Sequence, residues 1–275
     1  MNPILTLRAD NADKRVCRHC HTPIDGAPHA RERGEFCCES CFLAAPAPHT
    51  LPVAVKDPPF ALAEALVAAL DAREHETGLH SRRVACHTLV LAKHFTTEPQ
   101  RLRQVYYGAL LHDIGKIGIP DAILLKQGAL TESEWQVMRT HSEIGHRILA
   151  GAPFMDEAAE IVLYHEEHFD GSGYPRGLAG TAIPLWPRLF AVIDTLDAMT
   201  SDRPYRKGLS FDAACAEILR FARAQFDPDA LDVFVAEETR LRNMVKLKCG
   251  DATLEGPLTS NGRTERPWGI SRGET

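Results

Sequence analysis

The chain has 275 residues, 44% of them hydrophobic and 25% charged, which is the composition of a globular protein with one or two domains. Its net charge of −6 argues against a general DNA- or RNA-binding protein, and no apolar run approaches the ~20 residues of a membrane helix. The N-terminus shows no signal peptide, so we expect a cytoplasmic protein with no DNA, RNA or membrane partner.

Five of the eight Cys residues lie close together after residues 1–16, which show no clear period and are expected to be mobile. In a reducing compartment such a cluster is more typical of a metal site than of disulfides. Two short Cys pairs separated by a polar loop predict a small module at residues 17–42 that binds one Zn. Its expected ligands are Cys17, Cys20, Cys38 and Cys41, with Cys37 as an alternative to Cys38. A redox-active or regulatory thiol cluster is the other interpretation.

Five prolines in residues 43–59 predict an extended linker and a domain boundary. From Phe60 onward, apolar residues recur every three or four positions, which predicts a helix to about Glu76. Further helices are expected at residues 81–95 with Ser81 as cap, at 98–116, from a Thr131 capping box through His141, and at 156–168, 189–199 and 211–225. Residues 170–187 are rich in Gly and Pro and should form a loop. No strand pattern is convincing, so the second domain, residues 60–240, is predicted to be all-α, with residues 241–275 a disordered tail.

A His and an Asp stand next to each other in the apolar segment Leu110–Lys116. An imidazole and a carboxylate are good ligands for a divalent metal ion. Lys116 follows His112 by four residues, so in a helix its ammonium group would lie at the same end of the site. Metal ions that hold water, next to a Lys that contacts a phosphate oxygen, are suited to phosphoester hydrolysis. A buried His that pairs with Asp113 for structural reasons is the alternative.

Other His residues stand beside acidic residues on separate predicted helices. Helical bundles build metal sites from side chains that project inward from facing helices. Together these residues suggest a centre with two or three metal ions. They are Glu76 with His80, His112 with Asp113, His141, His165 with Glu166 and Glu167, and Asp194 with Asp197.

The chain therefore carries an ordered set of motifs. They are His112-Asp113-Ile114-Gly115-Lys116, His141-x-x-x-Gly145, His165-x-Glu167, Asp170-Gly171-Ser172-Gly173-Tyr174-Pro175, Asp194-x-x-Asp197-Ala198-Met199-Thr200 and Arg203-Pro204-Tyr205-Arg206. From about Leu62 to Asp232 the chain resembles the HD-GYP family. The resemblance implies an HD-type helical bundle that hydrolyses the bacterial second messenger cyclic di-GMP to linear pGpG, and in some members on to GMP.

The same resemblance implies metal ligands at His80, His112, Asp113, His141, His165 and Asp194. In members with a third metal, a Glu four residues before the first of these is also a ligand, and Glu76 stands there, which favours three ions over two. Fe or Mn is expected, with other divalent metals open. Where the family usually has His-His-Glu, this chain has Glu166 as the second residue. Glu166 could bind a metal, shift the preference towards Mn, or mark an impaired enzyme.

The resemblance also implies roles in catalysis and substrate binding. The expected reaction is the attack of a metal-activated water molecule on a phosphodiester, with Asp113 among the catalytic residues. Lys116 should contact the scissile phosphate, and Asp197 should orient Lys116 or the water. Arg203 and Arg206 are suited to the second phosphate, because a guanidinium group can bind phosphate through two hydrogen bonds. The expected guanine side of the pocket is formed by Gly173, Tyr174 and Pro175.

Two other functions stay open. One is a phosphohydrolase for a different nucleotide, and the other is a receptor for cyclic di-GMP, or a protein-interaction module, that does not catalyse. Glu166 is the residue that favours the second. Signalling proteins as partners and a homodimer also stay open.

Overall fold

The computed structural model describes residues 58–74, 79–152, 154–202 and 207–246. The predicted zinc module with Cys17, Cys20, Cys38 and Cys41 therefore lies outside the described residues. So do residues 43–57 of the expected linker, most of the expected tail, and three predicted site residues. These three are Glu76, Arg203 and Arg206.

The described part of the chain is helical, which confirms the all-α prediction. Its α-helices are α2 (Pro58–Glu74), α3 (Leu79–Ala92), α4 (Pro99–Leu110), α5 (Asp121–Leu124), α6 (Glu132–Met138), α7 (His141–Leu149), α8 (Asp156–Tyr164), α9 (Leu185–Thr200), α10 (Phe211–Arg220), α11 (Pro228–Ala236) and α12 (Glu238–Lys246). Two short 3-10 helices are η2 (Ile114–Gly118) and η3 (Gly180–Ala182). Within the described ranges, β-type pairing is limited to two isolated bridges.

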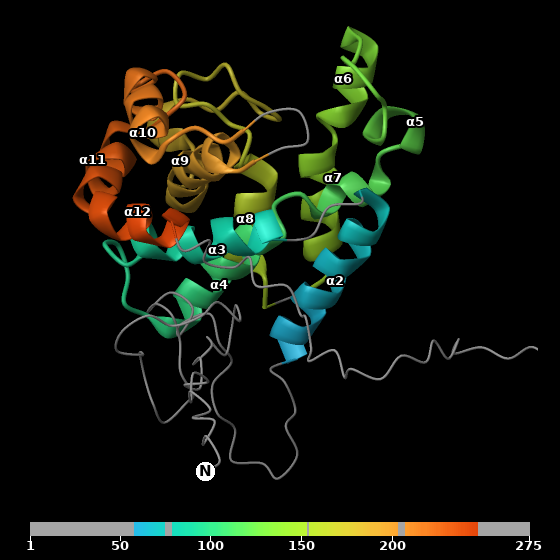
Figure 1. Cartoon of the computed structure of the whole chain (residues 1–275). Coiled ribbons are helices and arrows are strands. Elements are labelled where there is room, and N and C mark those ends of the chain that lie inside the picture. Colours follow the sequence, from blue (N-terminus) through green and yellow to red (C-terminus); the bar gives the residue numbers. More distant parts are fainter. Residues whose placement is uncertain (1–57, 75–78, 153, 203–206, 247–275) are drawn as a thin grey trace, which may run out of the picture.

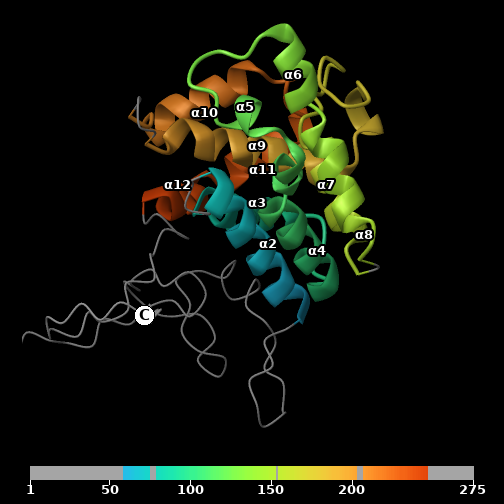
Figure 2. The same cartoon turned by 90° about the vertical axis from the view of Figure 1, so that its right-hand side faces the viewer.

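Four helices form the centre of the bundle: α3 packs on α4 and α9, and α8 packs on the same two helices. In Figure 1, α10, α11 and α12 lie on one side of this centre, and α5, α6 and α7 lie on the other. The turned view in Figure 2 shows α6 at the far end of the molecule from the N-terminal end of α2. None of the helices in the described ranges has the length and apolarity needed to cross a membrane.

The core lies between these central helices. Leu89 of α3, Leu110 of α4, and Phe190 and Ile193 of α9 are almost fully buried. Complete burial of such a side chain contributes about 1.5–3 kcal/mol before the entropy of ordering is counted. Gly108 allows α4 to approach α8 closely, because a Cβ there would lie 2.7 Å from a side-chain carbon on α8. The fold therefore holds its central helices in tight contact around the segment that carries the His-Asp pair.

Local capping signals set several helix starts. Thr131 caps α6 through the predicted capping box, in which its side chain and that of Glu134 each accept a backbone N–H. Ser210 caps α10 and Asp227 caps α11. Ser81, by contrast, is not a cap, because α3 already begins at Leu79.

Replacing Thr131 by alanine should speed amide hydrogen exchange within α6 about fivefold, which corresponds to the ~1 kcal/mol that a lost N-cap costs. The effect should be local because none of the seven residues of α6 is buried. Mass spectrometry of exchange in this peptide would measure it. Thr131→Ser keeps the capping oxygen and is the control. Equal exchange in the alanine and serine variants would show that the cap does not stabilise α6.

Several predicted boundaries near the site were wrong. The helix expected at 98–116 ends at Leu110, so His112 and Asp113 lie in the turn between α4 and η2. His141 does not belong to the helix that Thr131 caps, because it begins the separate helix α7. The helix expected from residue 189 starts at Leu185.

The C-terminal part of the domain is longer than predicted. Helices α11 and α12 were not expected, and the predicted disordered tail from residue 241 begins inside α12. Two residues of α12, Leu241 and Met244, are buried in the core. The bundle therefore extends at least to Lys246.

Candidate metal centre

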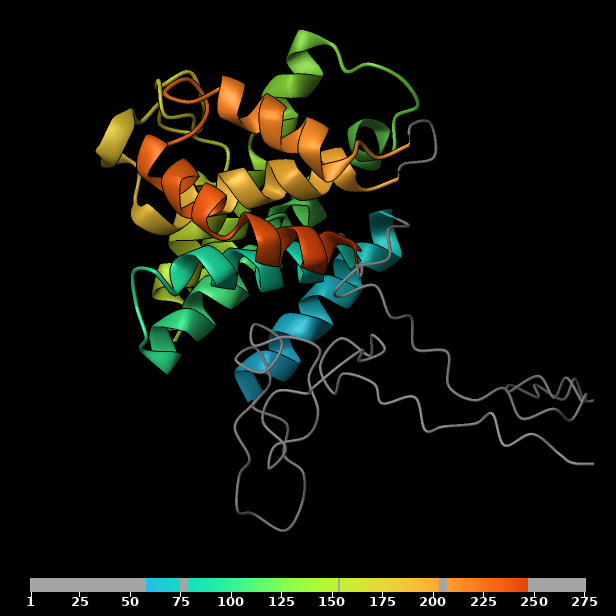
Figure 3. The same ribbon diagram turned by 60° about the vertical axis from the view of Figure 1, so that its left-hand side comes forward.

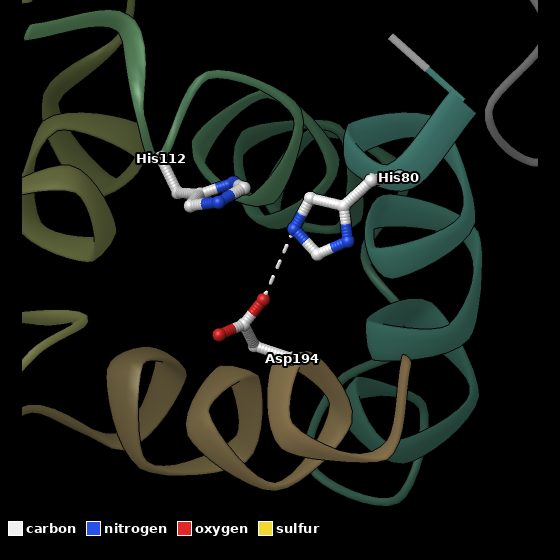
Figure 4. Close-up of side chains that lie close together, drawn as sticks. All are labelled: His80, His112 and Asp194. Atoms are coloured by element: carbon white, nitrogen blue, oxygen red, sulfur yellow. Dashed lines mark ion pairs between the residues drawn. The ribbon is translucent and has the colours of Figure 1, made fainter. Parts of the chain in front are cut away.

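Six of the predicted metal ligands lie in two groups. In each group, one ligand atom from every residue lies within 4.8 Å of the others. The first group is His80, His112 and Asp194, and the second is Asp113, His141 and His165. The six side chains come from α3, the α4–η2 turn, the start of α7, the end of α8, and α9. In Figure 4, His80 and Asp194 face each other from α3 and α9, 3.2 Å apart, and His112 points into the same space.

The two groups adjoin each other at the His-Asp pair. The Nε2 of His112 lies 3.1 Å from an oxygen of Asp113, although the two residues belong to different groups. This placement depends on the turn after α4, which directs consecutive side chains to neighbouring positions. The arrangement is suited to two ions side by side.

All four imidazole rings are held by their Nδ1 atoms. In three of them Nδ1 donates to the carbonyl oxygen of the residue three positions earlier, at 2.9 Å: His112 to Ala109, His141 to Met138 and His165 to Val162. A carbonyl oxygen only accepts, so Nδ1 carries a hydrogen, and in the neutral ring the lone pair is on Nε2. His80 contacts the carboxylate of Asp197 through Nδ1, at 2.7 Å. Such contacts are typical of metal-binding His residues, whose Nε2 atoms face the ion.

The donor atoms fit metal ions. The Nε2 atoms of His141 and His165 are only 3.1 Å apart, so their two lone pairs face each other and favour a cation between them. Burial lowers the pKa of His165 to about 4, with further lowering by His141 and His112. This ring is therefore neutral near pH 7, as a metal ligand must be.

The acidic ligands are ionised. Burial opposes ionisation of Asp113, but Lys116 and His112 hold the pKa of its carboxyl group well below its usual range. Burial likewise opposes ionisation of Asp194, and a hydrogen bond from His80 lowers the pKa of that carboxyl group. For His80, burial disfavours the charged ring, but hydrogen bonds with Asp194 and Asp197 raise its pKa to about 10. In the absence of metal, His80 therefore holds a proton, which an ion bound at Nε2 would replace.

Asp197 has a different role from the predicted one. It was expected to orient Lys116 or a water molecule, but its buried carboxylate binds His80 and Arg83. Arg83 donates to both oxygens of Asp197, at 2.7 and 3.0 Å. Sequence reasoning missed Arg83, although it follows His80 by three residues on the same helix, a spacing that places both side chains on one face.

Lys116 lies at the edge of the second group. Its Nζ atom is 2.7 Å from Asp113 and 3.7 Å from Glu74, which sequence reasoning also missed. The predicted i,i+4 relation to His112 was wrong, because the segment is a 3-10 helix and the contact is with Asp113 at i,i+3. The ion pair with Asp113, the residue just before η2, thus places the Lys116 ammonium group beside the two ligand groups.

The Gly-rich loop brings Tyr174 to the centre. Its ring centroid is 6.3 Å from that of His141, and the guanidinium carbon of Arg139 lies 5.6 Å from the Tyr174 ring centroid. Burial and a hydrogen bond with Glu166 raise the pKa of Tyr174, so its hydroxyl group stays protonated. Glu166 belongs to neither ligand group and lies 3.9 Å from His165, on the side of the tyrosine.

Backbone contacts fix the shape of this loop. A Cβ on Gly173 would lie 2.3 Å from the backbone nitrogen of His168, so only glycine fits there. Pro175 follows a cis peptide bond. Glu167, which the sequence placed with His165 in the suggested metal centre, belongs to neither ligand group. It is buried and accepts the backbone N–H groups of Arg176 and Leu178, at 2.7 and 3.0 Å. The loop is therefore anchored by a buried carboxylate next to a predicted metal ligand.

Comparison with known proteins identifies a family and several relatives of this chain. The family model described as "HD domain" matches residues 64–230. The cyclic di-GMP phosphodiesterase response regulator RpfG of Xanthomonas campestris is 39% identical over 181 residues, which are 65% of this chain and 48% of that protein. A cyclic di-GMP phosphodiesterase of Vibrio cholerae is 40% identical over 190 residues, 64% of this chain and 39% of that protein. The chain thus spans half or less of the length of these curated relatives.

A solved structure shares the fold. It is a cyclic GMP-AMP specific phosphodiesterase of V. cholerae, with a TM-score of 0.52 and 19% identity. The match covers 67% of this chain and 50% of the other.

Proposed function

The chain belongs to the HD domain family, and within it we propose that this protein is a phosphodiesterase that hydrolyses cyclic di-GMP to linear pGpG, with GMP as the product if the second bond is also cleaved. The observation that carries the proposal is the pair of adjoining ligand groups, with the Lys116 ammonium 2.7 Å from Asp113. The names of the two relatives support the choice of substrate, and the HD-GYP motifs in the sequence support it further.

The imidazole and carboxylate donors suit Fe or Mn. Ions bound there would activate a water molecule for attack and neutralise charge on the phosphate. We propose one ion at each described group, and a third that Glu76 would help to hold. Glu166 is not needed for either described group, so its replacement of the usual His is compatible with activity.

The chain's own residues bind and orient the substrate. Lys116 is proposed to contact an oxygen of the scissile phosphate, with Asp113 fixing its ammonium group. Asp197 orients the ring of His80 through its contact with Nδ1, which leaves Nε2 facing the ligand group. Arg203 and Arg206 are proposed to bind the second phosphate. The guanine side of the pocket is assigned to Gly173, Tyr174 and Pro175.

The remaining assignments come from the sequence. We propose one Zn at the Cys-rich module, a cytoplasmic location, and signalling proteins or a second copy of the chain as partners. Elemental analysis of the full chain would test the first, with one Zn per chain as the expected value.

The test is an assay on the full chain purified without oxygen, with the metal content measured on the same sample. Cyclic di-GMP, 3′3′-cyclic GMP-AMP and linear pGpG would be compared as substrates, with products separated by chromatography. We expect two or three Fe or Mn per chain and faster cleavage of cyclic di-GMP than of the mixed dinucleotide. If the protein bound cyclic di-GMP tightly but formed no product with added Fe or Mn, it would instead be a receptor that does not catalyse. Glu166 would then be the residue that distinguishes it from the active enzymes. Faster cleavage of another nucleotide would favour the alternative of a phosphohydrolase for a different substrate.

A further inference from the structure

Arg73, in the last turn of α2, reaches across to the 3-10 helix η2. Its guanidinium group donates to the backbone carbonyl oxygens of Lys116, at 3.3 Å, and of Ile117 and Ile119. It also donates twice to one carboxylate oxygen of Asp121, at 3.0 and 2.7 Å. One side chain of α2 thus binds the backbone on both sides of the end of η2.

The chemistry of arginine suits this position. The carbonyl oxygen of Lys116 also accepts the N–H of Ile119, but the last carbonyl groups of a short helix otherwise need donors from elsewhere. A guanidinium group presents five N–H donors in one plane, so it can satisfy several carbonyl oxygens at once. Asp121 holds the guanidinium group on the outer side. The end of η2 is therefore fixed by a single planar group.

The segment that Arg73 binds is the one that carries Lys116. The neighbouring Glu74 also contacts the Lys116 ammonium, at 3.7 Å, so the last turn of α2 contacts both the backbone and the side chain of this lysine. On its other side η2 packs against α7, which begins with His141. Figure 3 shows α2 running along one edge of the bundle, with one end projecting beyond it.

We propose that Arg73 is a positioning residue: by holding the η2 backbone it sets where the Lys116 ammonium lies relative to the metal centre. This inference rests on the proposed function, because the role of Lys116 in binding phosphate is part of it. A displacement of about 1 Å in a catalytic group can cost about 100-fold in rate.

The test compares Arg73→Met with a matched control. Methionine keeps an unbranched apolar stem but removes every donor. The control is Arg82→Met, because Arg82 of α3 binds Glu64 of α2, at 2.6 and 3.1 Å, and so ties the same helix without touching η2. We expect Arg73→Met to lower kcat for cyclic di-GMP about 10- to 100-fold with little change in KM or metal content. Arg82→Met should stay within about threefold of the parent, since it leaves η2 untouched.

Two further measurements separate positioning from a general loss of structure. Amide hydrogen exchange in the peptide that spans η2 should rise in Arg73→Met and not in Arg82→Met, and this readout needs no turnover. In a double-mutant cycle, adding Arg73→Met to Lys116→Met should cause no further loss of kcat, because the group being positioned is already absent. Asp121→Asn is the milder substitute if Arg73→Met does not fold, and the same direction of change is expected.

The outcomes distinguish this inference from the proposed function. Unchanged exchange in η2, or losses that multiply in the double variant, would overturn the role of Arg73. A parent protein without turnover, but with faster η2 exchange in Arg73→Met, would refute the proposed function and leave the contact with η2 intact. Full activity in Lys116→Met would show that this lysine is not needed for catalysis, and the proposed role of Arg73 would then be refuted.

Discussion

Replacing Asp113 by asparagine should lower kcat for cyclic di-GMP at least about 100-fold, the scale on which loss of one preorganised electrostatic contact acts. The Asp113 carboxylate is shared by four partners. They are Lys116 at 2.7 Å, His112 at 3.1 Å, His141 at 3.5 Å and His165 at 3.9 Å. Asparagine has nearly the same shape but no charge, so it would bind a cation more weakly and remove the negative charge that lies 2.7 Å from the Lys116 ammonium. The bundle should stay folded, because the packing is unchanged.

The measurement is kcat and metal content on the same preparation, with circular dichroism to verify the fold. Asp212→Asn is the control, since Asp212 is exposed and pairs with Arg242 away from the centre. It should keep kcat within about twofold of the parent, as expected for a surface change. An Asp113→Asn variant with full rate and full metal content would show that this residue is not a ligand.

Gly115→Ala should reduce the free energy of unfolding by about 3 kcal/mol or more, at the upper end of what overpacking costs. A Cβ at this position would lie 1.8 Å from the carbonyl oxygen of His141 and 2.5 Å from the backbone nitrogen of Gly145. Both are backbone atoms, so no change of rotamer can relieve the contact, and η2 and α7 must move apart. Because His141 begins α7, the second ligand group should lose metal affinity as well.

Urea unfolding with and without added Mn would measure both effects. Gly151→Ala is the matched control, because the nearest atom to its new Cβ would be 4.0 Å away. This control should change stability by no more than about 0.5 kcal/mol. If the two alanine variants proved equally stable, the close approach of η2 to α7 would be refuted.

The sequence predicted the helical class because apolar residues recur at helical spacing through most of residues 60–240. It could not show where the third helix ends, because the apolar pattern continues from Leu110 through Ile114 without a Gly or Pro to interrupt it. At the end of this helix the side chain of His112 donates back to the carbonyl oxygen of Ala109, a local contact that the apolar pattern does not reveal. Helix α11 had a local signal that was overlooked, since Asp227 is followed at once by Pro228, a typical cap and first residue.

For the site, the sequence pointed to residues that the structure brings together, because His and acidic residues stand side by side in recognisable motifs. The contacts that hold these residues in place could not be predicted, because they join residues far apart in the sequence. Arg83 and Asp197 are 114 positions apart, and Arg73 and Lys116 are 43 apart. A single sequence carries no signal for such pairs, so it predicts neither the contact of Asp197 with Arg83 nor that of Arg73 with η2.

The distance along the chain between His80 and Asp194 has a consequence for the behaviour of the whole domain. These two residues lie on α3 and α9, and helices α4 to α8 come between them in the sequence. An ion held by both would act as a reversible cross-link that closes a very long loop. Because a link across a long loop removes more entropy from the unfolded chain than a link across a short one, it stabilises the folded domain more. Chelation would then lower the free energy of unfolding, while the hydrogen bonds of Arg83 with Asp197 would still join α3 to α9.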